Sequence, residues 1–127
     1  MEIVNSNSQG VCPPVSTKGE TLGTNYYAQD GQQIVTWESR IGLKTSTNGA
    51  QSPATRLEHE IDHAVDEADH PSEHRGRRDT PNGQFVNEEE KRVILGSEFK
   101  TATANGETTR NNHYGTPYKV SSPISIF

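Results

Sequence analysis

The chain has 127 residues, 28% of them hydrophobic, and a mean hydropathy of -0.89. This length and composition fit one domain with a thin apolar core and exclude two independently cored domains. The net charge is -5, and the only basic cluster, Arg75, Arg77 and Arg78, lies beside acidic residues, so we expect no nucleic-acid partner. The single cysteine, Cys12, cannot form an internal disulfide, and a bound metal would help to stabilise so small a core.

The N-terminal segment has neither the basic start nor the apolar run of a secretory signal, and no stretch approaches transmembrane length. We therefore expect no signal peptide and no membrane span. Residues 1–20 are rich in Ser, Asn, Gln, Gly and Pro, which is typical of a flexible lead-in or a junction with a larger carrier. The domain is expected over residues 21–120, and residues 121–127 form a tail.

The first elements predicted in the domain are β-strands. Two strand-like runs, at residues 26–27 and 34–37, flank an Asp-Gly dipeptide that is typical of a tight turn. A third short strand is expected around residues 41–45. Together these runs predict a short antiparallel sheet over residues 21–46.

A helix is predicted to begin at Ser52-Pro53, because serine caps free backbone N–H groups and proline fits the first helical position. Apolar residues then recur at spacings of four, three and four and form one stripe: Leu57, Ile61, Ala64 and Ala68. The helix is expected to end at His70-Pro71, since proline disfavours helical geometry in the preceding residue.

The rest of the chain predicts less regular structure. Residues 71–84 contain two prolines and two glycines and are expected to form an exposed connection. A second helix should begin after Asn87 and turn Val93 and Ile94 inward, with Gly96 interrupting it and a further helical piece over residues 97–105. The tail from residue 111 onward shows no clear periodicity.

The motif with chemical content is His-Glu-Ile-Asp-His at residues 59–63, an H-E-x-x-H pattern inside the first predicted helix. Residues four apart share a helix face, so His59 and His63 can both offer an imidazole nitrogen to one Zn²⁺ ion. Glu60 is then placed to act as general base on a metal-activated water. The alternative interpretation is an acidic amphipathic helix whose histidines face solvent.

A catalytic zinc site needs a third protein ligand. Asp69 has no glycine before it to turn the chain back, and His70 is out of register with the motif. The glutamates at 88–90 fit better, because they open a separate helix that can pack across the first, as in sites with two histidines and one glutamate.

Helical phase favours Glu90 among these glutamates, because it shares the inward face of Val93 and Ile94. Glu89 is the second choice. The alternative role for Glu90 is a capping box with Asn87, and Glu89 could instead orient a histidine through its other ring nitrogen. The same orienting role, or a solvated position, is open for Glu98.

Amide hydrolysis also develops negative charge on the attacked carbonyl oxygen, so donors are expected near the metal. Arg110, His113 and Tyr114 supply such groups together. Each could equally belong to an ordinary polar loop.

These residues resemble a known family. The segments at 57–64, 89–94 and 110–115 are similar to the zinc metallopeptidase domains of type III secretion effectors and to the C-terminal toxin domains of Rhs and VgrG carriers. The Glu-Glu-x-Arg run with a later Arg and Tyr is also similar to clostridial neurotoxin light chains. That resemblance implies Glu90 as the third ligand and Arg110 and Tyr114 as transition-state residues, with His113 able to replace Tyr114 because the spacing departs from the neurotoxin pattern.

The resemblance further implies a toxin or effector that a specialised secretion system, such as type VI, delivers into a target cell. Its partners would be a protein or peptide substrate in the recipient cell, a cognate immunity protein and an upstream Rhs- or VgrG-type carrier. We thus expect an α+β zincin-like domain in which a short antiparallel sheet packs on the H-E-x-x-H helix and a second, glutamate-bearing helix. Its expected activity is zinc-dependent peptide hydrolysis. The alternatives are a zinc-dependent cell-wall amidase or peptidase, and a non-catalytic metal-stabilised binding module, for which Glu60 would have no use.

Overall fold

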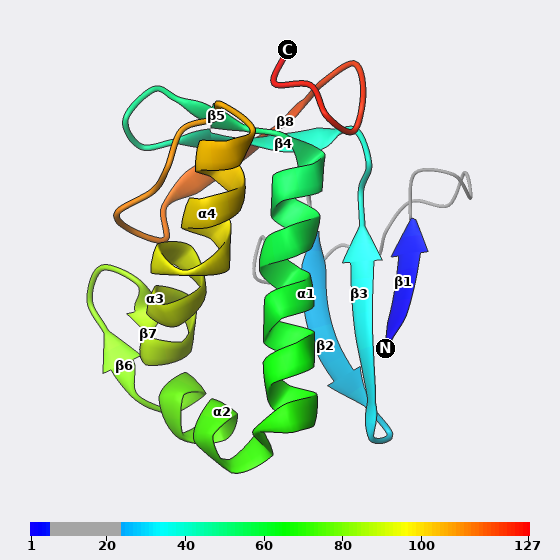
Figure 1. Cartoon of the computed structure of the whole chain (residues 1–127), viewed down its shortest axis with the longest axis vertical. Helices are drawn as coiled ribbons and strands as arrows, with labels where there is room; N and C mark the ends of the chain where they lie inside the picture. Colours follow the sequence, from blue (N-terminus) through cyan, green and yellow to red (C-terminus); the bar gives the residue numbers. More distant parts are fainter. Residues whose placement is uncertain (6–23) are drawn as a thin grey trace.

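The computed structural model describes residues 1–5 and 24–127, and these residues form an α+β fold (Figure 1). Its helices are α1 (Pro53–Asp69), α2 (Pro71–Arg78), α3 (Glu88–Leu95) and α4 (Ser97–Ala104). Its strands are β1 (Glu2–Asn5), β2 (Asn25–Gln29), β3 (Gln32–Trp37), β4 (Ile41–Thr45), β5 (Ala50–Gln51), β6 (Pro81–Asn82), β7 (Val86–Asn87) and β8 (Gly115–Lys119). The α1 helix runs through the middle, between the β1–β3–β2 sheet and the α3–α4 pair.

The predicted hairpin is confirmed as the antiparallel pair β2–β3. Its turn residues Asp30 and Gly31 have positive φ angles of 51° and 79°, as a tight hairpin turn requires. On the other edge of β3, β1 pairs in parallel, with Ile3 opposite Val35. Residues 2–5 of the expected flexible lead-in or carrier junction therefore form a strand, while residues 6–20 lie outside the described part of the chain.

The third predicted strand is also present, as β4, but it belongs to a second sheet of order β5–β4–β8. The expectation of one antiparallel sheet over residues 21–46 is therefore wrong. The partner β8 comes from the tail, where Lys119 lies opposite Ile41. Because β8 is an edge strand with mostly exposed side chains, no apolar alternation marks it in the sequence.

Helix α1 begins and ends where the sequence indicates. The side chain of Ser52 accepts a hydrogen bond from the backbone N–H of Thr55, Pro53 occupies the first helical position, and His70 is the C-cap residue. The face that α1 buries is not the apolar stripe. Of the predicted stripe, Leu57 and Ile61 are only half-buried. The buried residues of α1 are mainly polar: Pro53, Thr55, His59, His63, Ala64 and Glu67.

Residues 71–78 form helix α2, so the expectation of an exposed connection over residues 71–84 is wrong for its first half. Pro71 ends α1 and also starts α2, because proline suits the first position of a helix as well as it stops the preceding one. The helix is mostly exposed, but His74 is buried and its side chain faces α1.

Helices α3 and α4 confirm the second predicted helix and its interruption. Asn87 caps α3 by accepting from the N–H of Glu90, and Val93 and Ile94 are completely buried. Gly96 separates α3 from α4, and Gly106 follows with a positive φ of 70°.

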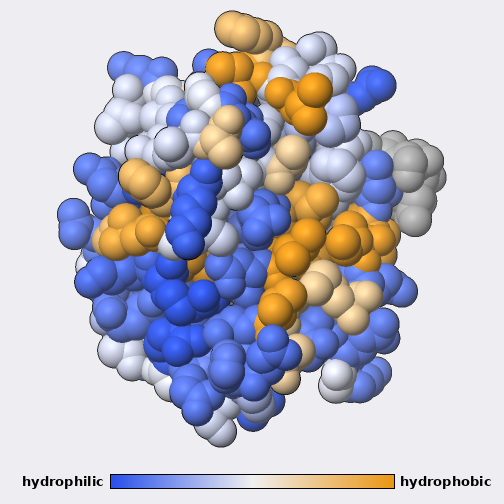
Figure 2. All heavy atoms as spheres, viewed as in Figure 1, coloured by the Kyte–Doolittle hydropathy of each residue, from blue (hydrophilic) through white to orange (hydrophobic). Residues whose placement is uncertain are grey.

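The apolar core is small, as the composition predicts. Among the described residues the buried hydrophobic side chains are Val35, Ile41, Ala50, Ala64, Phe85, Val93, Ile94, Ala102 and Val120. Figure 2 shows a mostly hydrophilic surface, with apolar residues gathered in a band between α1 and β3. Within residues 1–5 and 24–127, the structure contains no helix of the length and apolar character that crossing a bilayer demands.

Candidate metal centre

Helix α1 carries the two motif histidines on its buried face, and α3 brings a carboxylate to them. The Nε2 atoms of His59 and His63 lie 3.1 Å apart. Glu90 places Oε1 2.9 Å from Nε2 of His59 and Oε2 3.0 Å from Nε2 of His63. The three residues predicted as metal ligands therefore come together, in a group whose donor atoms all lie within 4.8 Å of one another. We call these three residues the donor group.

The donor group fits zinc by both chemistry and spacing. Two imidazole nitrogens and one carboxylate are the protein ligands of thermolysin-type catalytic sites, and tetrahedral bonds of 2.0–2.1 Å place neighbouring donor atoms roughly 3.3 Å apart. The closest approaches between the three side chains, 2.9, 3.0 and 3.1 Å, are near that value, with a different oxygen of Glu90 facing each histidine.

A further carboxylate lies behind each histidine. Nδ1 of His59 donates to Oε1 of Glu98 at 2.7 Å, and Nδ1 of His63 donates to Oε2 of Glu89 at 2.9 Å. Such acceptors orient the ring and favour the tautomer whose Nε2 lone pair faces a metal. Glu98 is 0% exposed, so the alternative of a solvated Glu98 is wrong. Glu89 lies on the Nδ1 side of His63, away from the donor group.

Arginines neutralise the two carboxylates behind the histidines. The pairs are Arg56 and Arg110 with Glu98, and Arg77 and Arg92 with Glu89. Glu60 and Glu90 differ. In the described part of the chain, no arginine or lysine lies within 4.0 Å of either carboxylate, and their ion-pair partners are histidines. The negative charge that faces the centre is thus left for another cation to balance.

The pKa shifts follow from this imbalance. Burial alone would raise the pKa of Glu90, yet hydrogen bonds from His113, His59 and His63 hold that pKa well below its usual range. Burial would lower the pKa of His63, but its hydrogen bonds to Glu89 and Glu90 outweigh burial and raise this pKa to about 10. In the metal-free protein, a proton on an imidazole therefore compensates the charge that a metal cation would otherwise balance.

Glu60, the predicted general base, lies one residue from His59 on α1. Its Oε1 is 3.9 Å from Nε2 of His59, and its side chain is 13% exposed. It lines two hollows of about 530 and 300 Å³, and so does Glu90. The carboxylate is therefore accessible from the side on which a substrate could enter.

Arg110 is placed differently from the other predicted transition-state residues. It is 5% exposed, its Nε and Nη2 donate to Glu98 at 2.8 and 2.6 Å, and its Nη1 donates to the backbone carbonyl of His113 at 3.1 Å. Most of its hydrogen-bonding capacity is therefore used to hold Glu98 and the His113 loop. Its transition-state role stays a prediction, and its contacts are those of a positioning residue.

His113 and Tyr114 stand at the mouth of the centre. Nε2 of His113 lies 3.4 Å from Oε1 of Glu90, with 41% of the His113 side chain exposed. Tyr114 is 63% exposed, and both residues line the larger hollow together with Glu60. Either side chain can reach a molecule in that hollow.

Sequence reasoning missed the contribution of α2 and β2. Nδ1 of His74 lies 2.9 Å from Oδ2 of Asp66, and Arg77 donates to Oε1 of Glu89 at 2.8 Å and to Asp66. From β2, Tyr26 donates to Glu67. The signal for α2 was available in Pro71, which suits a helix start, but the glycine and second proline nearby favoured a loop.

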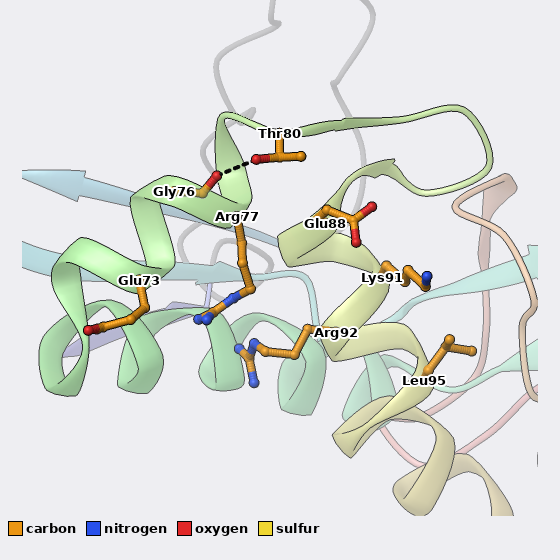
Figure 3. A pocket seen from close by; sticks show the side chains of 8 residues that line it. All are labelled: Glu73, Gly76, Arg77, Thr80, Glu88, Lys91, Arg92 and Leu95. Carbon is orange, nitrogen blue, oxygen red and sulfur yellow. Dashed lines mark hydrogen bonds between the residues drawn. The ribbon is translucent and has the colours of Figure 1, made fainter.

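Asp66, His74 and Glu89 form a second group of potential metal donors. Two arginines disfavour a cation at this group. Figure 3 shows Arg77 of α2 and Arg92 of α3 extending their guanidinium groups into the same space between the two helices. Both arginines pair with Glu89, so the positive charge of this group is already supplied. The hollow of about 600 Å³ that they line touches none of the donor group.

Comparison of the chain with protein-family models, with curated protein sequences and with solved structures gives no match. The resemblance described above therefore rests on the quoted residues and on the geometry of the donor group.

Proposed function

We propose that the protein is a zinc-dependent metalloendopeptidase whose metal is held by His59, His63 and Glu90. The observation that carries this proposal is the convergence of these donors, 2.9, 3.0 and 3.1 Å apart, beside carboxylates that have no arginine or lysine partner among the described residues. A divalent cation would supply the missing positive charge. Glu60 favours catalysis over a purely structural metal site, because a structural site needs no base.

The bound metal and the surrounding side chains have separate roles in the proposed hydrolysis. Zinc, when bound, supplies Lewis acidity for the activation of water and the polarisation of the substrate carbonyl. Glu60 accepts the proton of the attacking water and returns it to the leaving amine. His113 or Tyr114 donates to the carbonyl oxygen as negative charge develops there. Glu98 and Glu89 keep the histidine rings in orientation throughout.

A peptide can reach the centre along β2. This strand is an edge of its sheet, because the order is β1–β3–β2, and its Tyr26 lines both hollows that Glu60 lines. An extended substrate that pairs with the outer edge of β2, which bonds to no other strand among the described residues, would cross the donor group in a defined orientation. This arrangement favours an endopeptidase that binds unfolded or extended segments.

The decisive experiment compares wild type with Glu60→Gln after loading with zinc. We expect equal zinc content in the two proteins by atomic emission, because Glu60 is not in the donor group. Hydrolysis of an unbiased peptide mixture, followed by mass spectrometry, should be lost in Glu60→Gln by at least about 10²-fold. Equal hydrolysis rates would refute the mechanism, and wild type without stoichiometric zinc would refute the metal centre.

Delivery into a target cell as a toxin or effector is proposed on the resemblance alone. Expression of wild type and Glu60→Gln in the cytoplasm and, separately, in the periplasm of a recipient bacterium tests it. Growth arrest by wild type only, with new protein fragments in one compartment, is the expected result. Equal growth with both proteins in both compartments would contradict an antibacterial role.

A further inference from the structure

The larger hollow beside the donor group is lined by both polar and apolar residues. The polar lining includes Glu60, Glu90 and His113, together with Arg56 and Arg110, whose guanidinium groups already pair with Glu98. The apolar lining comes from β4, β7, β8 and the loop before β8, and we call these residues the apolar wall: Ile41, Leu43, Val86, Tyr114 and Pro117. A hollow of about 530 Å³ falls within the size range of binding sites for small molecules and side chains.

Val86 is the unusual member of the apolar wall. Its φ angle is +72°, in the left-handed region, where a β-branched residue is a genuine outlier. Glycine would adopt this conformation without strain, so the turn into α3 does not itself explain a valine. Backbone strain of this kind persists mainly at ligand-binding and catalytic sites.

Packing does not explain the valine either, because 60% of Val86 is exposed. Tyr114 in the same wall is 63% exposed. The two apolar side chains thus border a hollow that also contains the proposed general base. Exposed apolar groups around a concave, partly polar site are typical of surfaces that bury a ligand.

We infer that the apolar wall, with Val86 at its edge, receives a large aliphatic or aromatic side chain of the peptide substrate next to the cleaved bond. This inference rests on the proposed function and adds the class of residue that the site selects. The side chain would cover Val86 and Leu43 while the neighbouring carbonyl faces the donor group. Substrates with a charged residue at that position would leave the charge desolvated against apolar side chains and would be cleaved poorly.

Two substitutions at position 86 separate the effect of the valine side chain from the effect of the strained backbone. Val86→Thr keeps the branched shape and the strained backbone but makes the wall polar. Val86→Gly removes the side chain and relieves the strain. We expect Val86→Gly to unfold at a higher temperature than wild type when both are measured with chelator present. We expect both variants to show a several-fold higher KM for a peptide with Leu or Phe beside the cut, with kcat within about 2-fold of wild type. Val65→Thr, at an exposed valine of α1, is the control and should change neither.

Cleavage of a peptide mixture by zinc-loaded wild type should favour Leu, Ile, Met or Phe over Asp, Lys or Gly beside the cut by at least 10-fold, a ratio that hydrophobic pockets commonly reach. Cleavage without this preference, or a preference unchanged in Val86→Thr, would overturn the inference while leaving the peptidase in place. If wild type cleaves nothing, the proposed function fails. The wall is then tested by calorimetry of capped Ala-Ala-Leu-Ala-Ala against its all-alanine analogue with Glu60→Gln protein, where equal affinity overturns it.

Discussion

Nδ1 of His59 lies 2.7 Å from Oε1 of Glu98, a carboxylate with no solvent exposure. The same carboxylate accepts hydrogen bonds from Arg56, Arg110 and Gln51. One buried side chain therefore joins a proposed metal ligand to two guanidinium groups and to β5. The orientation of the ligand and the stability of the fold depend on the same group.

Removal of this carboxylate should harm stability first. Glu98→Ala leaves the buried Arg110 and the half-buried Arg56 without their carboxylate partner, and breaking a buried ion pair from one side typically costs about 3–5 kcal/mol. We expect that loss in the free energy of urea unfolding, measured with chelator so that metal binding does not contribute. Glu98→Gln should lose less, and Glu73→Ala, at an exposed position of α2, should stay within about 0.5 kcal/mol of wild type. A wild-type unfolding free energy in Glu98→Ala would contradict the buried network.

The donor group predicts a ranking of zinc affinities. Glu90→Ala removes a ligand and should abolish stoichiometric zinc binding. Glu89→Ala removes only the acceptor behind His63 and should weaken binding by about 10–100-fold. Competition with a chromophoric chelator measures both constants. The reverse ranking would assign the metal to Glu89.

Metal removal should destabilise the fold. A ligand present at about 1,000 times its dissociation constant stabilises the native state by roughly 4 kcal/mol, which for a domain of this size corresponds to a change in Tm on the order of 10 °C. Thermal unfolding with and without EDTA should show this difference in wild type. Glu90→Ala serves as the control, because its Tm should not respond to EDTA.

His113 and Tyr114 compete for the role of donor to the carbonyl oxygen. His113 is held by the Arg110 contact to its carbonyl and lies 3.4 Å from Glu90, so we favour His113. His113→Gln should lower kcat by roughly 10²-fold without loss of zinc, as removal of an oxyanion donor does. Tyr114→Phe should lower it by less than 10-fold. A large loss in Tyr114→Phe alone would reverse the assignment.

Tyr26 gives a pH dependence that can be measured in the metal-free protein. Burial and the hydrogen bond to Glu67 raise the pKa of Tyr26 above its ordinary value of 10. A pKa raised in the folded state stabilises the fold below the unfolded pKa and loses that contribution as pH rises through the folded pKa. We therefore expect wild type to lose stability more steeply than Tyr26→Phe above pH 10. Phenolate absorbance should show a late-ionising tyrosine in wild type that Tyr26→Phe lacks, and the same late phase in both proteins would contradict this.

The sequence predicted the elements that local signals mark. The Ser52-Pro53 start of α1, the Asp-Gly hairpin turn and the Asn87 cap of α3 were all found from short-range patterns, and the inward phase of Glu90 followed from Val93 and Ile94. The elements that were not predicted depend on pairing between segments distant in sequence. A parallel partner for β3 at residues 2–5 and an edge strand at the end of the chain carry little pattern of their own.

The orientation of α1 shows more clearly why local sequence patterns cannot predict every buried face. An apolar stripe normally identifies the buried face of a helix, yet His59 and His63 are 1% and 4% exposed while Leu57 is only half-buried. The polar face can be buried because carboxylates from α3 and α4 satisfy its hydrogen bonds, and no buried side-chain nitrogen or oxygen among the described residues lacks a partner. Those partners lie 26 and 39 residues away from the histidines in sequence, beyond any local pattern.

Contacts from residues near the end of the printed sequence affect the order in which the metal centre can form. The backbone N–H of Ala54, in the first turn of α1, donates to the carbonyl of Pro123 at 2.8 Å, and the Arg110 contact to Glu98 also comes from a late part of the chain. Because domains are completed during synthesis from the N-terminal side, α1 emerges from the ribosome well before the segments that hold it. We therefore expect a nascent chain that stops before residue 110 to lack a competent metal centre. The donor group would be fully supported only after the segment that contains Arg110 has been synthesised.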